Sequence, residues 1–247
     1  MKRLILLLVA FCFVIGVNAQ EKTKVLCVGN SFTFVGDAHK KLEAISKSEG
    51  HPLKLKSALV GGYTFYRHLQ DPKMIKCIES YDYEYDFVFL QNQSQVNALY
   101  ARNPKQHKLA MTDAKNLVCR VRQYSPHATI FMEQTWSYSG HKYGTFGSFE
   151  EFDNQLRKGT QLFAKATKTL VSPIGDAFII VRAERPDIVL YKDDNKHQNE
   201  YGSYLKACVN YLLMFHQPFS ENTDCCELDA KKCKFLQEVA QRVVLGK

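Results

Sequence analysis

The chain has 247 residues, a formal net charge of +8 at pH 7, and no low-complexity linker or internal repeat. This length suits one α/β domain with a sizeable core and leaves little room for a second. The basic residues are dispersed along the chain rather than clustered, which favours a solvated surface over a nucleic-acid groove. Nucleic acid is therefore not an expected partner.

The first 19 residues combine a basic start, an apolar stretch and a small-residue end. Lys2 and Arg3 precede the apolar stretch, and Ala19 occupies the position of the small residue before a cleavage site. The stretch is shorter than the ~20 apolar residues that span a bilayer. We therefore predict a signal peptide over residues 1–19 and one domain over residues 20–247. The domain is expected to be exported to the periplasm or the extracellular space, without a membrane span.

Short apolar segments alternate with amphipathic ones along the rest of the chain. The short segments are typical of strands buried on both faces, and the longer ones have helical periodicity. The alternation predicts an α/β fold, a three-layer α/β/α sandwich with a mostly parallel, five-stranded, flavodoxin-like sheet. The expected strands lie at residues 24–28, 54–59, 86–90, 129–134 and 169–171, and the clearest helices at 38–48, 110–124, 149–167 and 204–215.

A serine directly follows the first expected strand. In Gly29-Asn30-Ser31-Phe32, Ser31 stands where a buried strand meets its first loop. Such a serine can be a nucleophile, but most serines in turns of this kind only cap the following helix through the side-chain oxygen. The tetrad by itself leaves both interpretations open.

A carboxylate and an imidazole stand three residues apart near the other end of the chain. A hydrolytic serine needs a base to take its proton and a carboxylate to orient that base. Asp194 and His197, just before the last long apolar stretch, could supply both, and Asp193 is the neighbouring alternative. An exposed polar loop before a helix is the other interpretation. The chain order, with serine after the first strand and Asp and His before a late helix, favours catalysis.

Several polar and aromatic residues follow expected strands, and ligands of parallel sheets bind beyond the carboxyl ends of the strands. We therefore expect Ser31, Gly62, Gln91 and Trp136 at one edge of the sheet. Trp136 and Tyr63 are the candidate substrate-binding residues, because aromatic rings suit the apolar faces of sugar rings, and acyl chains nearly as well. A core position is an equal alternative for Trp136.

The order of these segments resembles that of the SGNH hydrolases, also called the GDSL esterase and lipase superfamily. Gly29-Asn30-Ser31 is similar to its first block, with Asn30 in place of the more usual Asp. Gly61-Gly62 is similar to the second block, whose glycine gives a backbone N–H to the oxyanion hole. Asp194-x-x-His197 is similar to the last block, which completes a catalytic triad. An uncharacterised secreted bacterial branch is the most similar part of the superfamily.

The third block departs from the usual Gly-x-Asn-Asp. Here the chain has Leu90-Gln91-Asn92-Gln93-Ser94, so Gln91 and Asn92 are both candidates for the side-chain donor of the oxyanion hole. The segment is somewhat similar to the Gln-Gly-Glu-Ser stretch of the sialate O-acetylesterase branch, which favours Gln91. The resemblance implies that the backbone N–H groups of Ser31 and Gly62 are the other donors. It requires no metal and no cofactor.

The resemblance implies a carboxylic ester hydrolase that works through an acyl-enzyme on a small-molecule or glycan ester. Related exported bacterial enzymes make a carbohydrate O-acetylesterase the first expectation, and others are lipases or thioesterases. The irregular third block leaves another class open, a non-catalytic glycan-binding protein on an esterase scaffold.

Seven cysteines remain once the one in the signal peptide is removed, so at least one is unpaired in a monomer. Cys225, Cys226 and Cys233 cluster near the C-terminus and could form one disulfide that tethers the final helix. The cluster has no paired Cys-x-x-Cys or nearby His to complete a zinc site. Cys27 and Cys208 lie in apolar runs and are expected in the core.

Overall fold

The computed structural model describes residues 21–140 and 145–246, so the predicted signal peptide over residues 1–19 lies outside the described residues. Within these ranges, five strands form one parallel sheet in the order β2-β1-β3-β4-β5. This is the flavodoxin-like order, and it confirms the predicted fold class with a sheet that is parallel throughout. The strands are β1 (Thr23–Gly29), β2 (Leu53–Leu59), β3 (Phe87–Leu90), β4 (Thr129–Glu133) and β5 (Leu170–Ser172).

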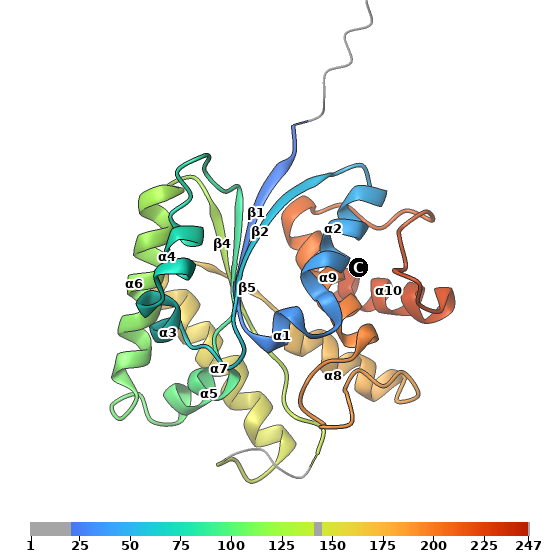
Figure 1. Ribbon diagram of the computed structural model, residues 1–247. Helices are drawn as coiled ribbons and strands as arrows, with labels where there is room; N and C mark the ends of the chain where they lie inside the picture. Colours follow the sequence, from blue (N-terminus) through green and yellow to red (C-terminus); the bar gives the residue numbers. More distant parts are fainter. Residues whose placement is uncertain (1–20, 141–144, 247) are drawn as a thin grey trace, which may run out of the picture.

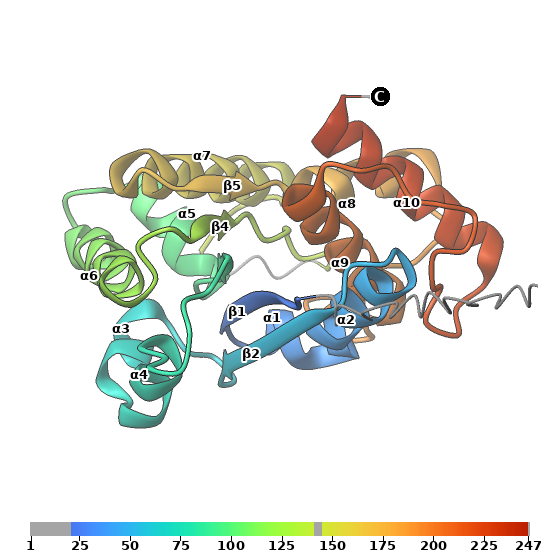
Figure 2. The ribbon, with the colours of Figure 1, turned by 90° about the horizontal axis from the view of Figure 1, so that it is seen from above.

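Helices cover both faces of the sheet, which gives three layers (Figure 1). One layer holds α3 (Phe65–Gln70), α4 (Pro72–Ile78), α5 (Ser94–Arg102), α6 (Lys108–Tyr124) and α7 (Phe149–Thr167). The other holds α1 (Ser31–Phe34), α2 (Ala38–Ser48), α8 (Ile174–Glu184), α9 (Glu200–Phe215) and α10 (Ala230–Leu245). Seen from above, α10 lies outside α8 and α9 and packs on both (Figure 2).

The first strand shows why the apolar segments are continuous rather than alternating. Val25 and Cys27 point into the core on the side of α2 and α9, whereas Leu26 and Val28 point into the core on the opposite side. All four are buried. Because helices cover both faces, each position of the strand needs an apolar side chain, as is usual for parallel sheets.

The predicted helices at 38–48 and 149–167 coincide with α2 and α7. The last predicted helix begins earlier than expected, at Glu200, because Asn199 caps it by accepting hydrogen bonds from the backbone N–H groups of Tyr201 and Gly202. The sequence interpretation did not find α3, α4, α5 and α8. The first three are short, and α8 is apolar around most of its circumference, so none has a strong helical stripe.

Two cysteines lie in the core as predicted, and the C-terminal cysteine cluster does not form the disulfide that the sequence left possible. Cys27 and Cys208 are buried, as predicted. Cys225, Cys226 and Cys233 are free thiols, and the Cys233 thiol donates to the Cys225 carbonyl oxygen at 3.6 Å instead of bonding to a sulfur. In the described part of the chain, no helix is both long and apolar enough to cross a membrane.

The strand order places a topological switch point at the carboxyl end of β1. The chain leaves β1 toward β2 on one side, and later strands are added beyond β3 on the other side. Connections from neighbouring strands therefore run to opposite faces, and such a switch point is where open parallel sheets bind ligands. Ser31 is two residues beyond the end of β1 and lies at this point.

Candidate active site

The nucleophile candidate begins α1 but does not cap it. Asn30 is the cap, because its Oδ1 accepts from the backbone N–H of Phe32 at 3.1 Å. Its Nδ2 donates to the Tyr63 carbonyl oxygen at 3.0 Å, which joins the loop after β1 to the loop after β2. Because the Asn30 side chain already accepts the hydrogen bond that caps the helix, the Ser31 hydroxyl is free to bond to another partner.

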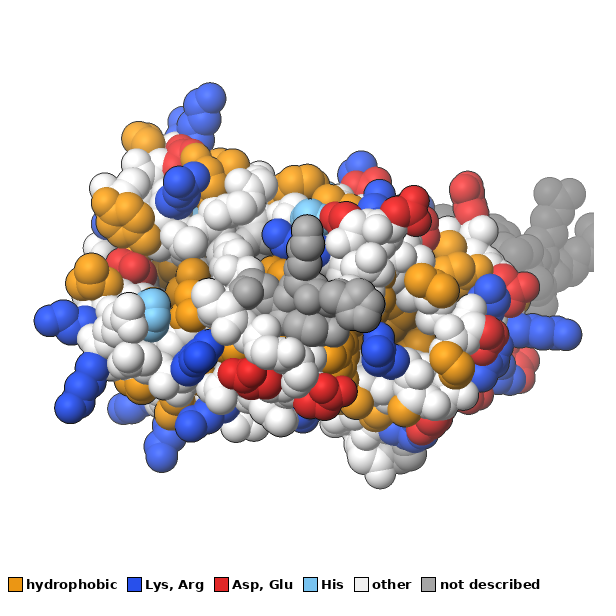
Figure 3. All heavy atoms as spheres, turned by 90° about the horizontal axis from the view of Figure 1, so that it is seen from below, with side chains coloured by type: hydrophobic (Ala, Val, Ile, Leu, Met, Phe, Trp, Pro, Cys, Tyr) orange, Lys and Arg blue, Asp and Glu red, His pale blue; other side chains and the backbone are white. Residues whose placement is uncertain are grey.

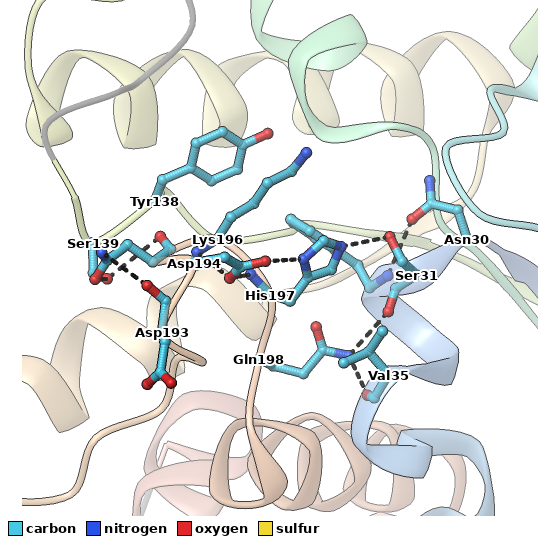
Figure 4. Close-up of polar contacts among 12 residues, drawn as sticks. Asn30, Ser31, Val35, Tyr138, Ser139, Asp193, Asp194, Lys196, His197 and Gln198 are labelled. Atoms are coloured by element: carbon cyan, nitrogen blue, oxygen red, sulfur yellow. Dashed lines mark hydrogen bonds and ion pairs between the residues drawn. The ribbon is translucent and has the colours of Figure 1, made fainter.

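That partner is His197, and a line of three side chains results (Figure 4). Ser31 Oγ lies 2.9 Å from His197 Nε2, and His197 Nδ1 lies 2.5 Å from Asp194 Oδ2. The other carboxylate oxygen of Asp194 accepts from the backbone N–H groups of Lys196 at 3.0 Å and His197 at 2.9 Å. The spacing Asp-x-x-His therefore forms a turn in which the carboxylate holds both the ring and the backbone of the histidine.

Asp194 is electrostatically suited to remain ionised beside the histidine. Partial burial opposes its ionisation, but hydrogen bonds from the His197 ring and from the backbone N–H groups of His197 and Lys196 outweigh that effect. Together they lower the pKa of Asp194 to about 2. The carboxylate is thus available, at neutral and mildly acidic pH, to stabilise a positive charge on the imidazole.

Asp193 points away from the histidine and is exposed (Figure 4). In the described part of the chain no hydrogen bond or ion pair involves its carboxylate, whereas its carbonyl oxygen accepts from Asn195 Nδ2 at 3.4 Å. The loop that carries both aspartates is fixed from two sides. The Ser139 backbone N–H donates to the Asn195 carbonyl oxygen at 2.8 Å, and Gln198 Nε2 donates to the Val35 carbonyl oxygen at 2.6 Å.

Trp136 lies in the core beneath the site rather than on its open side. Its ring is 1% exposed and stacks between Phe32, at a centroid distance of 4.8 Å, and Phe178, at 4.2 Å. The indole N–H donates to the Lys196 carbonyl oxygen at 3.1 Å. Of the two positions considered for Trp136, the structure therefore shows the one in the core. The contacts of Trp136 support the nucleophile helix and the histidine loop.

The loop after β2 brings Gly62 and Tyr63 next to the serine loop. Gly62 has a φ of +70°, a left-handed conformation that favours glycine. Tyr63 is joined to Asn30 through its carbonyl oxygen, and its hydroxyl donates to Asp71 at 3.2 Å. Across the described residues, no group accepts a hydrogen bond from the backbone N–H of Ser31 or Gly62.

The side-chain amides of Gln91 and Asn92 are buried and already hydrogen-bonded. Gln91 Oε1 accepts from the Asn30 backbone N–H at 2.9 Å, and Gln91 Nε2 donates to the Asn92 carbonyl oxygen. Asn92 Oδ1 accepts from the Phe65 backbone N–H at 3.1 Å, and its Nδ2 donates to Asn97 Oδ1 at 3.1 Å. In this arrangement both residues connect the end of β3 to neighbouring loops and helices.

Two charged residues beneath the site were missed by the sequence interpretation. Lys206 on α9 and Glu133 at the end of β4 are each 2% exposed and form an ion pair of 2.6 Å below α1. The available signal was a lysine inside an otherwise apolar helix, which is rare unless the charge has a buried partner. Nothing in the local pattern names that partner.

Figure 3 shows the face of the molecule at the carboxyl ends of the strands. On this face, Lys and Arg side chains are separated by Asp, Glu and apolar side chains rather than gathered in one continuous area. Phe34 of α1 is 37% exposed. Within the ranges that the structure describes, no group of three or more His, Cys, Asp or Glu side chains is placed to hold a metal ion.

The sequence and the fold of this chain can be compared with those of known proteins. No family model and no curated protein sequence matches the chain. A DUF4886 family protein from Bacteroides uniformis has a similar structure, with a TM-score of 0.77, 19% identity, and coverage of 91% of this chain and 95% of that one. A candidate SGNH hydrolase from Slackia heliotrinireducens gives a TM-score of 0.62 at 20% identity, with coverage of 78% and 100%.

A variant of the acetyl xylan esterase Axe2 from Geobacillus stearothermophilus has a TM-score of 0.56 and 13% identity, and the match covers 78% of this chain and 94% of the enzyme. At these identities the likeness establishes the fold. The strand order, the position of Ser31 at the switch point and these neighbours agree with the resemblance seen in the sequence: the chain has the fold of the SGNH hydrolases, the GDSL esterase and lipase superfamily.

Proposed function

We propose that the protein is a serine ester hydrolase with the triad Ser31, His197 and Asp194. The observation that carries the proposal is the continuous hydrogen-bonded line from Ser31 Oγ through the imidazole to the Asp194 carboxylate. A serine is a weak nucleophile unless a base within hydrogen-bond reach takes its proton, and that base works best when a third group fixes its orientation. Both conditions support the proposal, because His197 lies within hydrogen-bond reach of Ser31 and Asp194 bonds to the other ring nitrogen of His197.

The reaction follows from this geometry. His197 Nε2 takes the hydroxyl proton as Ser31 Oγ bonds to the ester carbonyl carbon, which leaves an oxyanion and an imidazolium supported by Asp194. The imidazolium then gives the proton to the departing alcohol, and the C–O bond to that alcohol breaks to leave an acyl-enzyme. Water attacks the acyl-enzyme with His197 again as the base, and the carboxylic acid is released.

The oxyanion would be held by the backbone N–H groups of Ser31 and Gly62, which have no acceptor among the described residues. A third donor from Gln91 or Asn92 remains a prediction. Either amide would have to give up or share its present hydrogen bond to Asn92 O or Asn97 Oδ1.

For the substrate we propose an acetylated carbohydrate. Acetyl xylan esterases are among the structures that share this fold. The ring of Phe34 stands three residues after the nucleophile, is 37% exposed, and lies beside the Gly61 turn, where a Cβ added at Gly61 would be 3.7 Å from it. An exposed ring beside the oxyanion donors would pack against the apolar face of a sugar.

The test is ester hydrolysis by the chain without residues 1–19. Wild-type protein should release acetate from acetylated xylan and hydrolyse p-nitrophenyl acetate. Ser31→Ala should abolish both activities without changing the thermal unfolding midpoint, and Ser57→Ala, which changes an exposed serine on β2, should leave them unchanged. Turnover that persists in Ser31→Ala would contradict the triad. A wild-type protein that binds acetylated glycans without cleaving them would instead support the glycan-binding alternative.

Export is the second part of the proposal, and it depends on the signal-like pattern of residues 1–19. Expression of the full chain in a bacterium should yield a mature protein that begins at Gln20 in the periplasm or the medium. Intact-mass measurement of that protein checks the cleavage site. A product that keeps residues 1–19 and stays with the cytosol would contradict it.

A further inference from the structure

A buried ammonium group lies directly below the nucleophile helix. Lys206 Nζ donates to the Phe32 carbonyl oxygen at 3.1 Å, to Thr33 Oγ1 at 2.8 Å and to Glu133 Oε2 at 2.6 Å. An ammonium has three N–H donors, so these contacts use all of them. Two of the three acceptors belong to the two residues that follow Ser31 in the chain.

The carboxylate that balances this charge is itself fully engaged. Glu133 Oε1 accepts from Asn210 Nδ2 at 2.8 Å, and Asn210 Oδ1 accepts from the Ser172 hydroxyl at 2.8 Å. The lysine and the glutamate are each 2% exposed. Removing two charges from water costs free energy that their attraction often does not fully recover, so a buried pair is weak evidence for a role in stability. The contacts to α1 point to a different role.

The same network reaches the residue before the serine. Thr33 Oγ1, which accepts from Lys206, donates to Gln91 Oε1 at 3.3 Å. Gln91 Oε1 also accepts from the Asn30 backbone N–H at 2.9 Å. The backbone on both sides of Ser31 is therefore held by one chain of hydrogen bonds that begins at Glu133.

We propose that Lys206, paired with Glu133, is a positioning residue that sets the place of Ser31 relative to His197. This inference deepens the proposed ester hydrolysis and rests on it. Lys206 touches neither the reacting atoms nor His197, so it acts through the backbone of α1. A shift of about 1 Å in a reacting group can lower turnover by about 100-fold, and two of the four residues of α1 accept hydrogen bonds from Lys206.

The decisive experiment removes the network without leaving a buried unpaired charge. In the double variant Lys206→Met/Glu133→Gln both positions are neutral, so the protein should fold, with a thermal unfolding midpoint close to that of the wild type. Because the hydrogen bonds to Phe32 and Thr33 are lost, kcat should fall by about 10- to 100-fold with little change in KM. The rate at which a p-nitrophenyl alkylphosphonate labels Ser31 should fall by a similar factor.

The matched control is the Lys–Glu pair of Lys41 and Glu200, which joins α2 to α9 at 2.5 Å without a contact to residues 30–33. Lys41→Met/Glu200→Gln should leave kcat and labelling unchanged. Thr33→Val keeps the buried ion pair but removes both the hydrogen bond from Lys206 Nζ and the link to Gln91, so it should lower kcat and labelling by several-fold. It provides the test even if the double variant does not fold.

Wild-type rates of turnover and labelling in Thr33→Val and in the folded double variant would overturn the positioning role. A wild-type protein that neither hydrolyses esters nor reacts with the phosphonate would instead overturn the proposed function. The two failures are therefore distinguishable.

Discussion

Two neighbouring aspartates differ in what they contact. Asp194 bonds to the ring and the backbone of His197, and its pKa is lowered to about 2 by these hydrogen bonds against the opposing effect of burial. Asp193 is exposed and lies on the other side of the turn (Figure 4). The difference follows from the turn, in which only the residue three before the histidine faces its Nδ1 atom.

Asp194→Asn should lower kcat by about 1,000- to 10,000-fold, because the amide keeps the shape but neither fixes the required tautomer nor supports the imidazolium. Asp193→Asn should change kcat less than twofold. Steady-state kinetics on p-nitrophenyl acetate measures both variants. A larger loss in Asp193→Asn would show that the other carboxylate serves the histidine, and full activity in both would indicate a Ser-His dyad.

Asn30 uses both ends of its amide, and a carboxylate cannot do the same. Its oxygen caps α1 and its nitrogen donates to the Tyr63 carbonyl oxygen, while the side chain is 3% exposed. In Asn30→Asp, a carboxylate oxygen would face that carbonyl oxygen, so a donor is lost and two acceptors repel.

Although Asp is the more usual residue of the superfamily at this position, we expect Asn30→Asp to destabilise the fold by about 1–3 kcal/mol. It should also lower kcat, because the Gly62 loop loses its tie to the serine loop. Urea unfolding and steady-state kinetics measure the two effects. Unchanged stability and activity would show that the hydrogen bond to Tyr63 is dispensable.

At the scale of elements, α5 and α7 pack closely because one residue has no side chain. A Cβ built on Gly159 of α7 would lie 2.0 Å from the carbonyl oxygen of Asn97 in α5. That oxygen belongs to the backbone, so a side-chain rotation cannot relieve the overlap, and the helices would have to move apart.

Gly159→Ala should therefore destabilise the protein by about 3 kcal/mol, at the upper end of the usual range for overpacking. Gly61→Ala is the matched control, because a Cβ there would meet nothing closer than Phe34 at 3.7 Å. Urea denaturation of both variants gives the comparison. Equal midpoints for Gly159→Ala and the wild type would mean that the two helices separate without cost.

At the scale of the whole molecule, the chain contains one tryptophan, and it lies between the two ends of the sequence that build the site. Trp136 stacks on Phe32 near the first strand and on Phe178 of α8, and it donates to the Lys196 carbonyl oxygen. Its fluorescence therefore reports on the packing that joins the N-terminal serine loop to the C-terminal histidine loop.

We expect urea unfolding followed by Trp136 fluorescence to coincide with unfolding followed by far-UV circular dichroism, since one cooperative transition moves all probes together. Measuring both signals on the same samples tests this. A fluorescence change at clearly lower urea concentration would show that the site end of the molecule opens before the sheet unfolds.

The sequence by itself predicted the elements and residues whose signals are local. Buried strands appear as apolar runs, long amphipathic helices as a 3.6-residue period, and Asp194-x-x-His197 as a single turn, so the fold class and the Asp-His pair could be predicted from local patterns. Ser31 is 166 positions from His197, and only the order of the segments along the chain and its resemblance to a known superfamily named it as their partner. The spacing within a turn limits how far two side chains can be from each other. Such signals are readable because neighbours in sequence are neighbours in space.

The tertiary structure decided what depends on residues far apart in the chain. It placed Trp136 in the core between Phe32 and Phe178, and it used the amides of Gln91 and Asn92 for hydrogen bonds inside the protein. Lys206 and Glu133 are 73 positions apart, and only the packing of α9 against the end of β4 brings their charges together. A buried polar side chain must find a partner, but the residue that becomes its partner is chosen by how the elements pack.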